Sequence, residues 1–206
     1  MDPESRASKC YLSPINLDDA DEFTELRRQR LICGWESDHQ TLESWKSKRD
    51  LKKLFWITVP DLGPGLRAGH ISLDKSSALL EPGFLRKNEI ELSLSSFFIL
   101  PEYRALRLGK HAVMLLEKLA TTEPYGSPCC RYLTLTALSK KYFYDEEWRG
   151  MWDRVGMQMP SFSIQEWYER LGYVSWKEEP LYEERTMDGE KIVLWEAFMK
   201  KDLWGL

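Results

Sequence analysis

Seven residues between a hydrophobic strand and an amphipathic helix carry the clearest chemical signal in the chain. They read Arg-Ala-Leu-Arg-Leu-Gly-Lys at positions 104–110 and follow Pro101-Glu102-Tyr103. Backbone N–H groups in the first turn of a helix have no intrahelical partner, and the helix dipole places partial positive charge there. A strand, a tight basic turn and a helix in this order therefore predict a site for a phosphate or another anion.

A second segment has the pattern of a short helix that ends at a glycine. It reads Trp-Tyr-Glu-Arg-Leu-Gly-Tyr at positions 167–173. Ser163 and Glu166 lie before it at the spacing of a capping box, and Gly172 suits the left-handed residue after a helix. Within this segment, Tyr168 fits a buried core tyrosine with a satisfied hydroxyl.

In this order, the two segments resemble the GNAT superfamily of acyl-CoA-dependent N-acetyltransferases. The family's turn is Arg/Gln-x-x-Gly-x-Gly/Ala, often entered through Pro-Glu-Tyr, and it holds the pyrophosphate of coenzyme A. Arg104 and Gly109 match its first and last positions, while Arg107 replaces its middle glycine. Arg107 is compatible with a helix-like backbone but crowds a phosphate, unless its guanidinium joins in binding. Taken alone, the first segment also fits an ordinary strand-to-helix turn.

The resemblance implies a fold and a cofactor. The expected fold is an α+β (α/β) GNAT fold, with a mixed central sheet of about six to seven strands, splayed in the middle and flanked by about four helices. Acetyl-CoA is the expected co-substrate, with no metal, and its acyl arm is expected to pair with the splayed strands. The cofactor-binding residues implied are Phe98, Ile99, Leu100, Arg104, Ala105, Leu106, Arg107, Leu108, Gly109 and Lys110.

Acetyl transfer to an amine needs a neutral amine, a polarised carbonyl and a proton for the departing thiolate. The resemblance assigns carbonyl polarisation to a backbone N–H near Phe98 and Ile99, and the proton to Tyr168. Many family members carry a glutamate eleven residues before the leading arginine, where this chain has Ser93. Glu91 lies two residues earlier on the same strand face, so a bulge or a bridging water would let it act as the base. The alternative for Glu91 is a solvated strand end.

Two functions follow from these residues. The first is an N-acetyltransferase that moves an acetyl group from acetyl-CoA directly to a primary amine on a small molecule or peptide. The second is a GNAT-fold acyl-CoA-binding regulatory protein without efficient catalysis, which the changes at Ser93 and Arg107 suggest. A formal net charge of −4 and a pI near 5.6 disfavour a nucleic-acid-binding protein.

The composition indicates an intracellular globular protein. A chain of 206 residues can form one N-acetyltransferase domain with a sizeable core. No apolar run approaches the roughly 20 residues of a membrane span, and the first residues lack the apolar core of a signal peptide. We therefore expect a cytoplasmic or nuclear protein without membrane contact. The four cysteines have no metal-type spacing and are expected to be free thiols.

Hydrophobic periodicity places the remaining elements. It predicts strands at 10–17, 54–59, 68–73, 88–100, 131–138, 173–176 and 191–199, and helices at 18–32, from a capping box at Ser37, from Leu108 and at 163–171. Pro82-Gly83 predicts a loop, and Asp188-Gly189 predicts a hairpin turn. By resemblance, the two early helices form a wall of the acceptor cleft, with Trp35, His39 and Trp45 as candidate contacts. Packing is the alternative for the two tryptophans.

An aromatic-rich insertion at about 139–162 is longer than the family's usual connection. Trp148, Met151, Trp152 and Val155 would share one helical face there. The segment is expected to be a small packed helix, a lid over the acceptor end or the surface of a homodimer.

Overall fold

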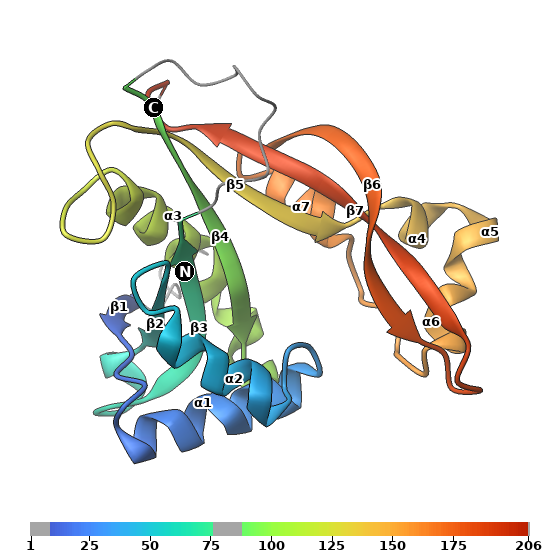
Figure 1. Ribbon diagram of the computed structural model, residues 1–206, viewed down its shortest axis with the longest axis horizontal. Coiled ribbons are helices and arrows are strands. Elements are labelled where there is room, and N and C mark those ends of the chain that lie inside the picture. Colours follow the sequence, from blue (N-terminus) through green and yellow to red (C-terminus); the bar gives the residue numbers. More distant parts are fainter. Residues whose placement is uncertain (1–8, 76–87, 206) are drawn as a thin grey trace, which may run out of the picture. The chain divides into compact units, whose positions relative to one another are not determined.

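The computed structural model describes residues 9–75 and 88–205, apart from the side chain of Ala105. Within those residues, seven strands form a sheet in the order β1-β2-β3-β4-β5-β7-β6 (Figure 1). The chain divides into two compact units, residues 1–133 and 134–206, and the division falls inside β5. The expected α+β architecture with a mixed seven-stranded sheet is confirmed, whereas the single domain and the splay stay predictions.

Unit 1 contains a run of antiparallel strands that are consecutive in sequence. They are β1 (Tyr11–Pro14), β2 (Lys52–Thr58), β3 (Arg67–Asp74) and β4 (Ile90–Ile99), followed by β5 (Cys130–Leu138). Each of the first four pairs with the next, and β1 lies at the sheet edge as its Pro14 predicts. The loop expected at Pro82 lies outside the described residues.

The helices of unit 1 begin and end largely as the sequence predicts. They are α1 (Ala20–Cys33), α2 (His39–Ser47) and α3 (Leu108–Ala120), with 3-10 turns η2 (Pro60–Leu62) and η3 (Pro101–Leu106). The Asp19 side chain caps α1, and Gly34 ends it with a left-handed φ of 84°. The cap of α2 is Asp38, which accepts from the N–H of Thr41, so the expected cap at Ser37 is wrong by one residue.

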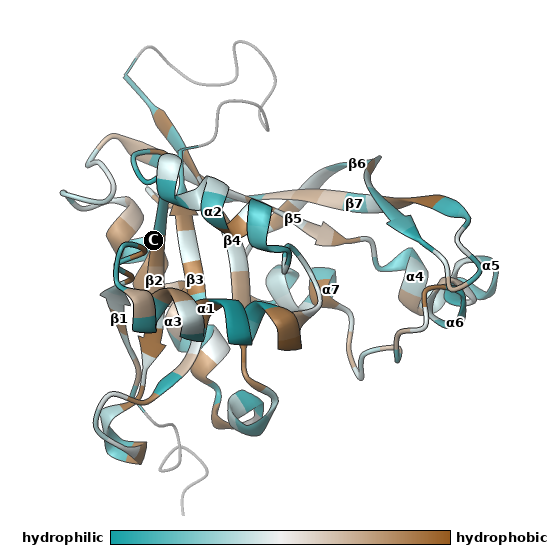
Figure 2. Ribbon diagram, turned by 60° about the horizontal axis from the view of Figure 1, so that its bottom comes forward, coloured by the Kyte–Doolittle hydropathy of each residue, from teal (hydrophilic) through white to brown (hydrophobic). Residues whose placement is uncertain are grey.

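Two helical layers enclose the strands of unit 1. Leu26 of α1 and Leu42 and Trp45 of α2 pack against Leu54 and Trp56 of β2. Neighbouring strand residues point to opposite faces, so Phe55 faces away from Trp56, and its ring lies 4.9 Å from that of Tyr125, beyond the end of α3. Figures 1 and 2 show α1 and α2 on one side of the strands, with hydrophilic residues along much of both helices.

Unit 2 combines the aromatic insertion with a long hairpin. Its elements are α4 (Lys141–Tyr144), α5 (Glu146–Arg149), α6 (Met151–Arg154), α7 (Ile164–Glu169), β6 (Val174–Arg185) and β7 (Lys191–Asp202). The hairpin turn expected at Asp188-Gly189 is present, with φ 87° at Gly189. The single helical face expected around Trp148 is wrong, because α5 and α6 are separate turns that meet at Gly150.

The insertion's aromatic side chains make internal contacts in unit 2. Trp152 donates its indole N–H to the carbonyl of Tyr142 at 2.9 Å, and the Tyr142 hydroxyl accepts from the N–H of Trp195 at 3.0 Å. The ammonium of Lys141 lies 4.0 Å and 3.5 Å from the ring centroids of Trp148 and Trp195. These contacts agree with the packed alternative, while the lid and the dimer surface stay predictions.

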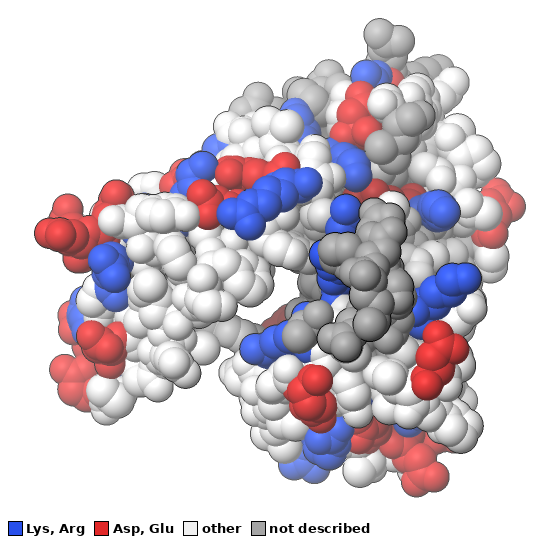
Figure 3. All heavy atoms as spheres, turned by 180° about the vertical axis from the view of Figure 1, so that it is seen from behind, with Lys and Arg blue, Asp and Glu red and all other residues white. Residues whose placement is uncertain are grey.

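The surface carries charges of both signs. On the face drawn in Figure 3, Lys and Arg side chains are interspersed with Asp and Glu. Over the described ranges, no helix combines the length and the apolar character that crossing a membrane requires.

Candidate functional site

The predicted anion turn is formed where two helices meet at Arg107. The 3-10 helix η3 ends at Leu106, α3 begins at Leu108, and Arg107 between them is left-handed, with φ 59° and ψ 14°. The helix-like backbone with which Arg107 is compatible is therefore not the one it adopts. Glycine adopts the left-handed region without a steric cost, whereas another residue pays about 1–2 kcal/mol. The conformation explains why the family's motif has glycine at this position.

The start of α3 leaves backbone donors without protein partners. Leu108, Gly109 and Lys110 occupy its first turn, so their N–H groups have no intrahelical acceptor. No side chain caps this end, and no hydrogen bond from these three N–H groups is found in the described part of the chain. The helix has 13 residues, long enough for a substantial dipole. The turn thus has the features of an anion site.

Arg104 connects the turn to the end of β4. Its Nε donates to the carbonyl of Ile99 at 3.1 Å, and its guanidinium lies 5.6 Å from the ring centroid of Phe98. The N–H of Leu100 donates to the carbonyl of Ala68 at 2.9 Å. The strand end predicted to contact the cofactor is therefore buried and held from both sides, by β3 and by the turn.

Cys10, the residue before β1, anchors α3 close to the same turn. Cys10 donates its N–H to Nδ1 of His111 at 3.3 Å, and its thiol lies 3.9 Å from the carbonyl of Leu108. Burial raises the pKa of the Cys10 thiol to about 11. The thiol therefore stays protonated at neutral pH and acts in packing.

A bulge interrupts β4 before it reaches the turn. His70 of β3 lies opposite Phe98, but Ser72 lies opposite Ser95, so β4 contains one extra residue in this interval. Ser96 lies in it and has a φ of 45°. The bulge considered for Glu91 would have lain near Ser93, whereas the observed one follows Ser93 by three residues.

Glu91 and Ser93 are both buried, each with 8% of its surface exposed. Burial excludes the solvated strand end as the role of Glu91, and its role as a base stays a prediction. Asp74 at the end of β3 lies directly opposite Ser93. Residues opposite each other in antiparallel strands share a face, so a carboxylate lies beside the position where many GNAT members carry glutamate.

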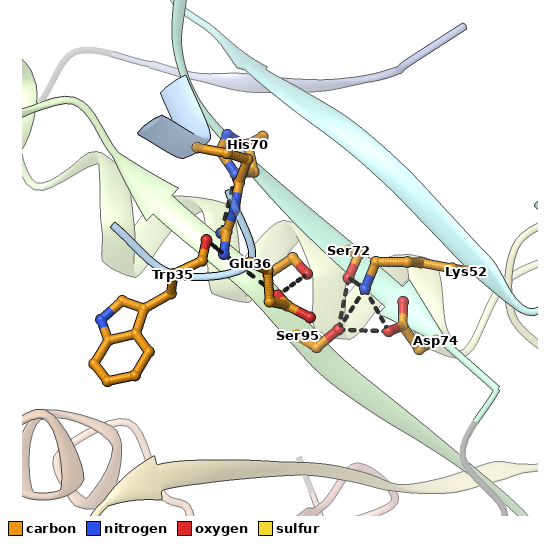
Figure 4. Close-up of polar contacts among 9 residues, drawn as sticks. Trp35, Glu36, Lys52, His70, Ser72, Asp74 and Ser95 are labelled. Atoms are coloured by element: carbon orange, nitrogen blue, oxygen red, sulfur yellow. Dashed lines mark hydrogen bonds and ion pairs between the residues drawn. The ribbon is translucent and has the colours of Figure 1, made fainter. Parts of the chain in front are cut away.

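Asp74 belongs to a polar cluster that spans three strands (Figure 4). Its Oδ2 accepts from Nζ of Lys52 at 2.8 Å and from Oγ of Ser95 at 2.5 Å. Lys52 also donates to Ser95 and to Ser72. Sequence reasoning missed the cluster because it depends on the register of β2, β3 and β4, which no local pattern reveals.

A second polar group joins the loop between α1 and α2 to the bulge (Figure 4). The Arg30 guanidinium donates to the carbonyl of Trp35 and to Oε2 of Glu36 at 3.3 Å. Oε2 of Glu36 also accepts from Oγ of Ser96 at 3.3 Å. Sequence reasoning named Trp35 but missed Glu36. The other two residues suggested as contacts in the acceptor cleft are Trp45 and His39. Trp45 packs in the core of unit 1, and His39 is exposed beside Glu43.

Tyr168 lies in unit 2, on the helix that the sequence predicts. Ser163 caps α7 by accepting from the N–H of Glu166, and Gly172 is left-handed with φ 91°, as expected. Tyr168 is buried, and its ring packs 4.9 Å from Trp167 and 5.6 Å from Tyr173. Burial raises the pKa of its hydroxyl, which therefore keeps its proton at neutral pH. That is the protonation state a general acid needs.

Comparisons with known proteins find likeness in structure. No family model matches the sequence, and no curated protein matches it. An aminoglycoside 6'-N-acetyltransferase complexed with coenzyme A matches with a TM-score of 0.56 and 16% identity, over 94% of this chain and 97% of that one. NAA60 of Arabidopsis thaliana in complex with acetyl-CoA matches with a TM-score of 0.59 and 11% identity, over 94% of this chain and 98% of that one. The ribosomal-protein-S18-alanine N-acetyltransferase of Escherichia coli matches with a TM-score of 0.51 and 14% identity, over 95% of this chain and 94% of that one. The chain has the GNAT fold.

Within this GNAT fold, a buried histidine lies beside the strand end. His70 is fully buried, with Nδ1 3.0 Å from Oε1 of Gln29 and Nε2 3.5 Å from Nη1 of Arg30. An amide oxygen only accepts and a guanidinium only donates, so His70 is neutral with its proton on Nδ1. Burial, and then the charges of Arg30 and Lys52, hold its pKa well below the usual value.

The pH dependence of stability should report this histidine. Below about pH 6.5, His70 is protonated in the unfolded chain but not in the native protein. As the pH is lowered through this range, the free energy of unfolding therefore decreases by up to about 1.4 kcal/mol per pH unit. Urea unfolding at pH 7.5 and 5.5 measures the loss. His70→Gln should lose less stability over this interval than wild type. The exposed control His39→Gln should match wild type, and equal losses in all three proteins would contradict the assignment.

Proposed function

We propose that this protein is an N-acetyltransferase that moves an acetyl group from acetyl-CoA to a primary amine. The observation that carries the proposal is that the N–H groups of Leu108, Gly109 and Lys110 have no partner among the described residues, next to the left-handed residue at the family's glycine position. Such donors fit a pyrophosphate. The similar aminoglycoside 6'-N-acetyltransferase is in complex with coenzyme A and the similar NAA60 with acetyl-CoA, which supports the same cofactor here.

The reaction joins the amine nitrogen to the acetyl carbon and breaks the carbon–sulfur bond. We assign carbonyl polarisation to the backbone N–H near Phe98 and Ile99, because β3 and Arg104 hold this strand end in place. Tyr168 supplies the proton to the departing thiolate. Glu91 takes the proton from the amine, directly or through a water molecule. No covalent enzyme intermediate is required.

A second function is a GNAT-fold protein that binds acyl-CoA and regulates without efficient catalysis. Ser93 favours it, because the usual glutamate is missing. Arg107 favours it because a large side chain borders the proposed phosphate site. Neither change removes the anion turn itself, so both functions predict that acetyl-CoA binds.

Acetyl-CoA should raise the melting temperature of the protein. A ligand that binds only the native state at 100 times its Kd adds about 2.7 kcal/mol, or roughly 5–10 °C for a chain of this size. Thermal shift with saturating acetyl-CoA is the measurement. Gly109→Val should lose most of the shift because its side chain excludes the pyrophosphate, whereas Lys118→Val at the other end of α3 should keep it. A folded, unliganded wild type without a shift would contradict the cofactor assignment.

Thiol release separates the two functions. With acetyl-CoA and a panel of polyamines, amino acids, aminoglycosides and peptides, an N-acetyltransferase releases coenzyme A in proportion to acetylated product. Binding of acetyl-CoA without release for any amine would support the regulatory function.

A further inference from the structure

Two strained residues touch each other at the bulge of β4. Among the described residues, three other than glycine have a positive φ: Glu36, Ser96 and Arg107. Glu36 and Ser96, each with a φ of 45°, are joined by the hydrogen bond from Ser96 Oγ to Glu36 Oε2. Such conformations are strained and persist where surrounding contacts impose them, often at ligand sites. Their contact points to a site at this place.

A buried cation orients the Glu36 carboxylate. The Arg30 side chain is 3% exposed and lies between His70 and the Trp45 ring, whose centroid is 5.7 Å from its central carbon. It donates to Oε2 of Glu36 and to the carbonyl of Trp35. A buried guanidinium with fixed partners holds a carboxylate more rigidly than a surface lysine does. One oxygen of Glu36 is therefore fixed by Arg30 and Ser96.

The other oxygen of Glu36 faces a different environment. The Glu36 side chain is 50% exposed, and within the described residues Oε1 has no hydrogen-bond partner. The Lys52–Asp74 ion pair is less accessible to solvent than Glu36. Its side chains are only 10% and 22% exposed, and they bond mainly to each other and to serines. Glu36 thus presents an oriented negative charge to solvent beside the bulge (Figure 4).

We propose that Oε1 of Glu36 binds the amino group of the acceptor and thereby selects cationic alkylamines. The proposal rests on the proposed function and names the residue that recognises its second substrate. A charge-assisted hydrogen bond from an ammonium contributes more than one from a neutral amine. After the amine loses a proton it still donates an N–H to Oε1, so the contact persists when the nitrogen attacks. Ser96 precedes Phe98 by two residues, which places the amine close to the strand end assigned to the thioester carbonyl.

The test compares a cationic acceptor with an uncharged one. Glu36→Gln keeps the size and one acceptor oxygen but removes the charge. For a primary alkylamine, kcat/KM should fall by about 10- to 100-fold, mostly through KM, because a hydrogen bond to a charged group contributes about 1.5–3 kcal/mol. For an arylamine, which is uncharged at neutral pH, the change should stay below about threefold. Glu43 is a comparably exposed glutamate of α2, and Glu43→Gln is the matched control. It should leave kcat/KM unchanged for both the alkylamine and the arylamine.

The outcomes separate this assignment from the proposed function. Wild type without turnover on any amine overturns both. An active wild type whose Glu36→Gln variant loses alkylamine and arylamine activity equally, with an unchanged acetyl-CoA thermal shift, overturns only the role of Glu36. If Glu36→Gln does not fold, Glu36→Asp decides. Aspartate keeps the charge but shortens the side chain by one methylene. It should raise KM for the alkylamine and leave KM for the arylamine unchanged. An equal effect on both KM values overturns the role of Glu36.

Discussion

Gly69→Ala should destabilise the protein by about 3 kcal/mol or more. A Cβ atom at position 69 would lie 2.1 Å from the carbonyl oxygen of Phe98 and 3.0 Å from Cα of Ile99. Both are backbone atoms of the adjacent strand, so β3 and β4 must separate where the proposed cofactor strand ends. Urea unfolding followed by circular dichroism measures the change in the free energy of unfolding. Any folded Gly69→Ala protein should also lose much of its acetyl-CoA thermal shift.

Gly150→Ala is the matched control. Gly150 lies between α5 and α6 with φ −61°, and a Cβ there would meet nothing within 4 Å. Alanine at such a position should be neutral or stabilise by about 0.5–1 kcal/mol, because it restricts the unfolded chain. Similar unfolding midpoints for the two variants would show that Gly69 does not hold the strands together.

Tyr168→Phe should lower kcat by at least about 100-fold and leave acetyl-CoA binding almost unchanged. A general acid contributes 10²- to 10⁴-fold to rate, and the Tyr168 hydroxyl is assigned to the departing thiolate rather than to ground-state binding. Phenylalanine preserves the packing against Trp167 and Tyr173. Steady-state thiol release gives the rate, and the thermal shift gives the binding.

Tyr182→Phe provides the comparison, since Tyr182 is 49% exposed on β6 and has no role in the assignment. It should keep the wild-type rate.

The raised pKa of Tyr168 also predicts that wild-type activity does not fall between pH 7 and 9 through loss of this proton. An unchanged rate in Tyr168→Phe would leave Tyr168 a core residue.

Local signals in the sequence predicted the elements but not their cross-strand contacts. Ser163 and Gly172 act within a few residues of their own position, and both have the predicted capping role or conformation. The bulge at Ser96 depends on how β3 aligns with β4, and that alignment is set by contacts between residues more than twenty positions apart. Sequence reasoning therefore found the turn and missed Asp74 and Glu36.

Arg107 shows the same limit in one residue. Its identity is compatible with a helix-like backbone. The junction of η3 and α3 imposes a left-handed conformation instead, and the surrounding structure overrides the residue's own preference. The family's motif carried that information in its glycine.

The place of the unit division also bears on how the protein is made. Every described contact of the anion turn, including those with Cys10, Phe98 and Ile99, lies within the first 133 residues. Strands β1 to β4 pair in the order in which a ribosome delivers them, and early segments generally fold first during synthesis. The proposed pyrophosphate site can therefore assemble while the segment that carries Tyr168 is still being translated. If the assignments hold, a nascent chain would acquire its proposed cofactor turn before it has the proposed acid, Tyr168.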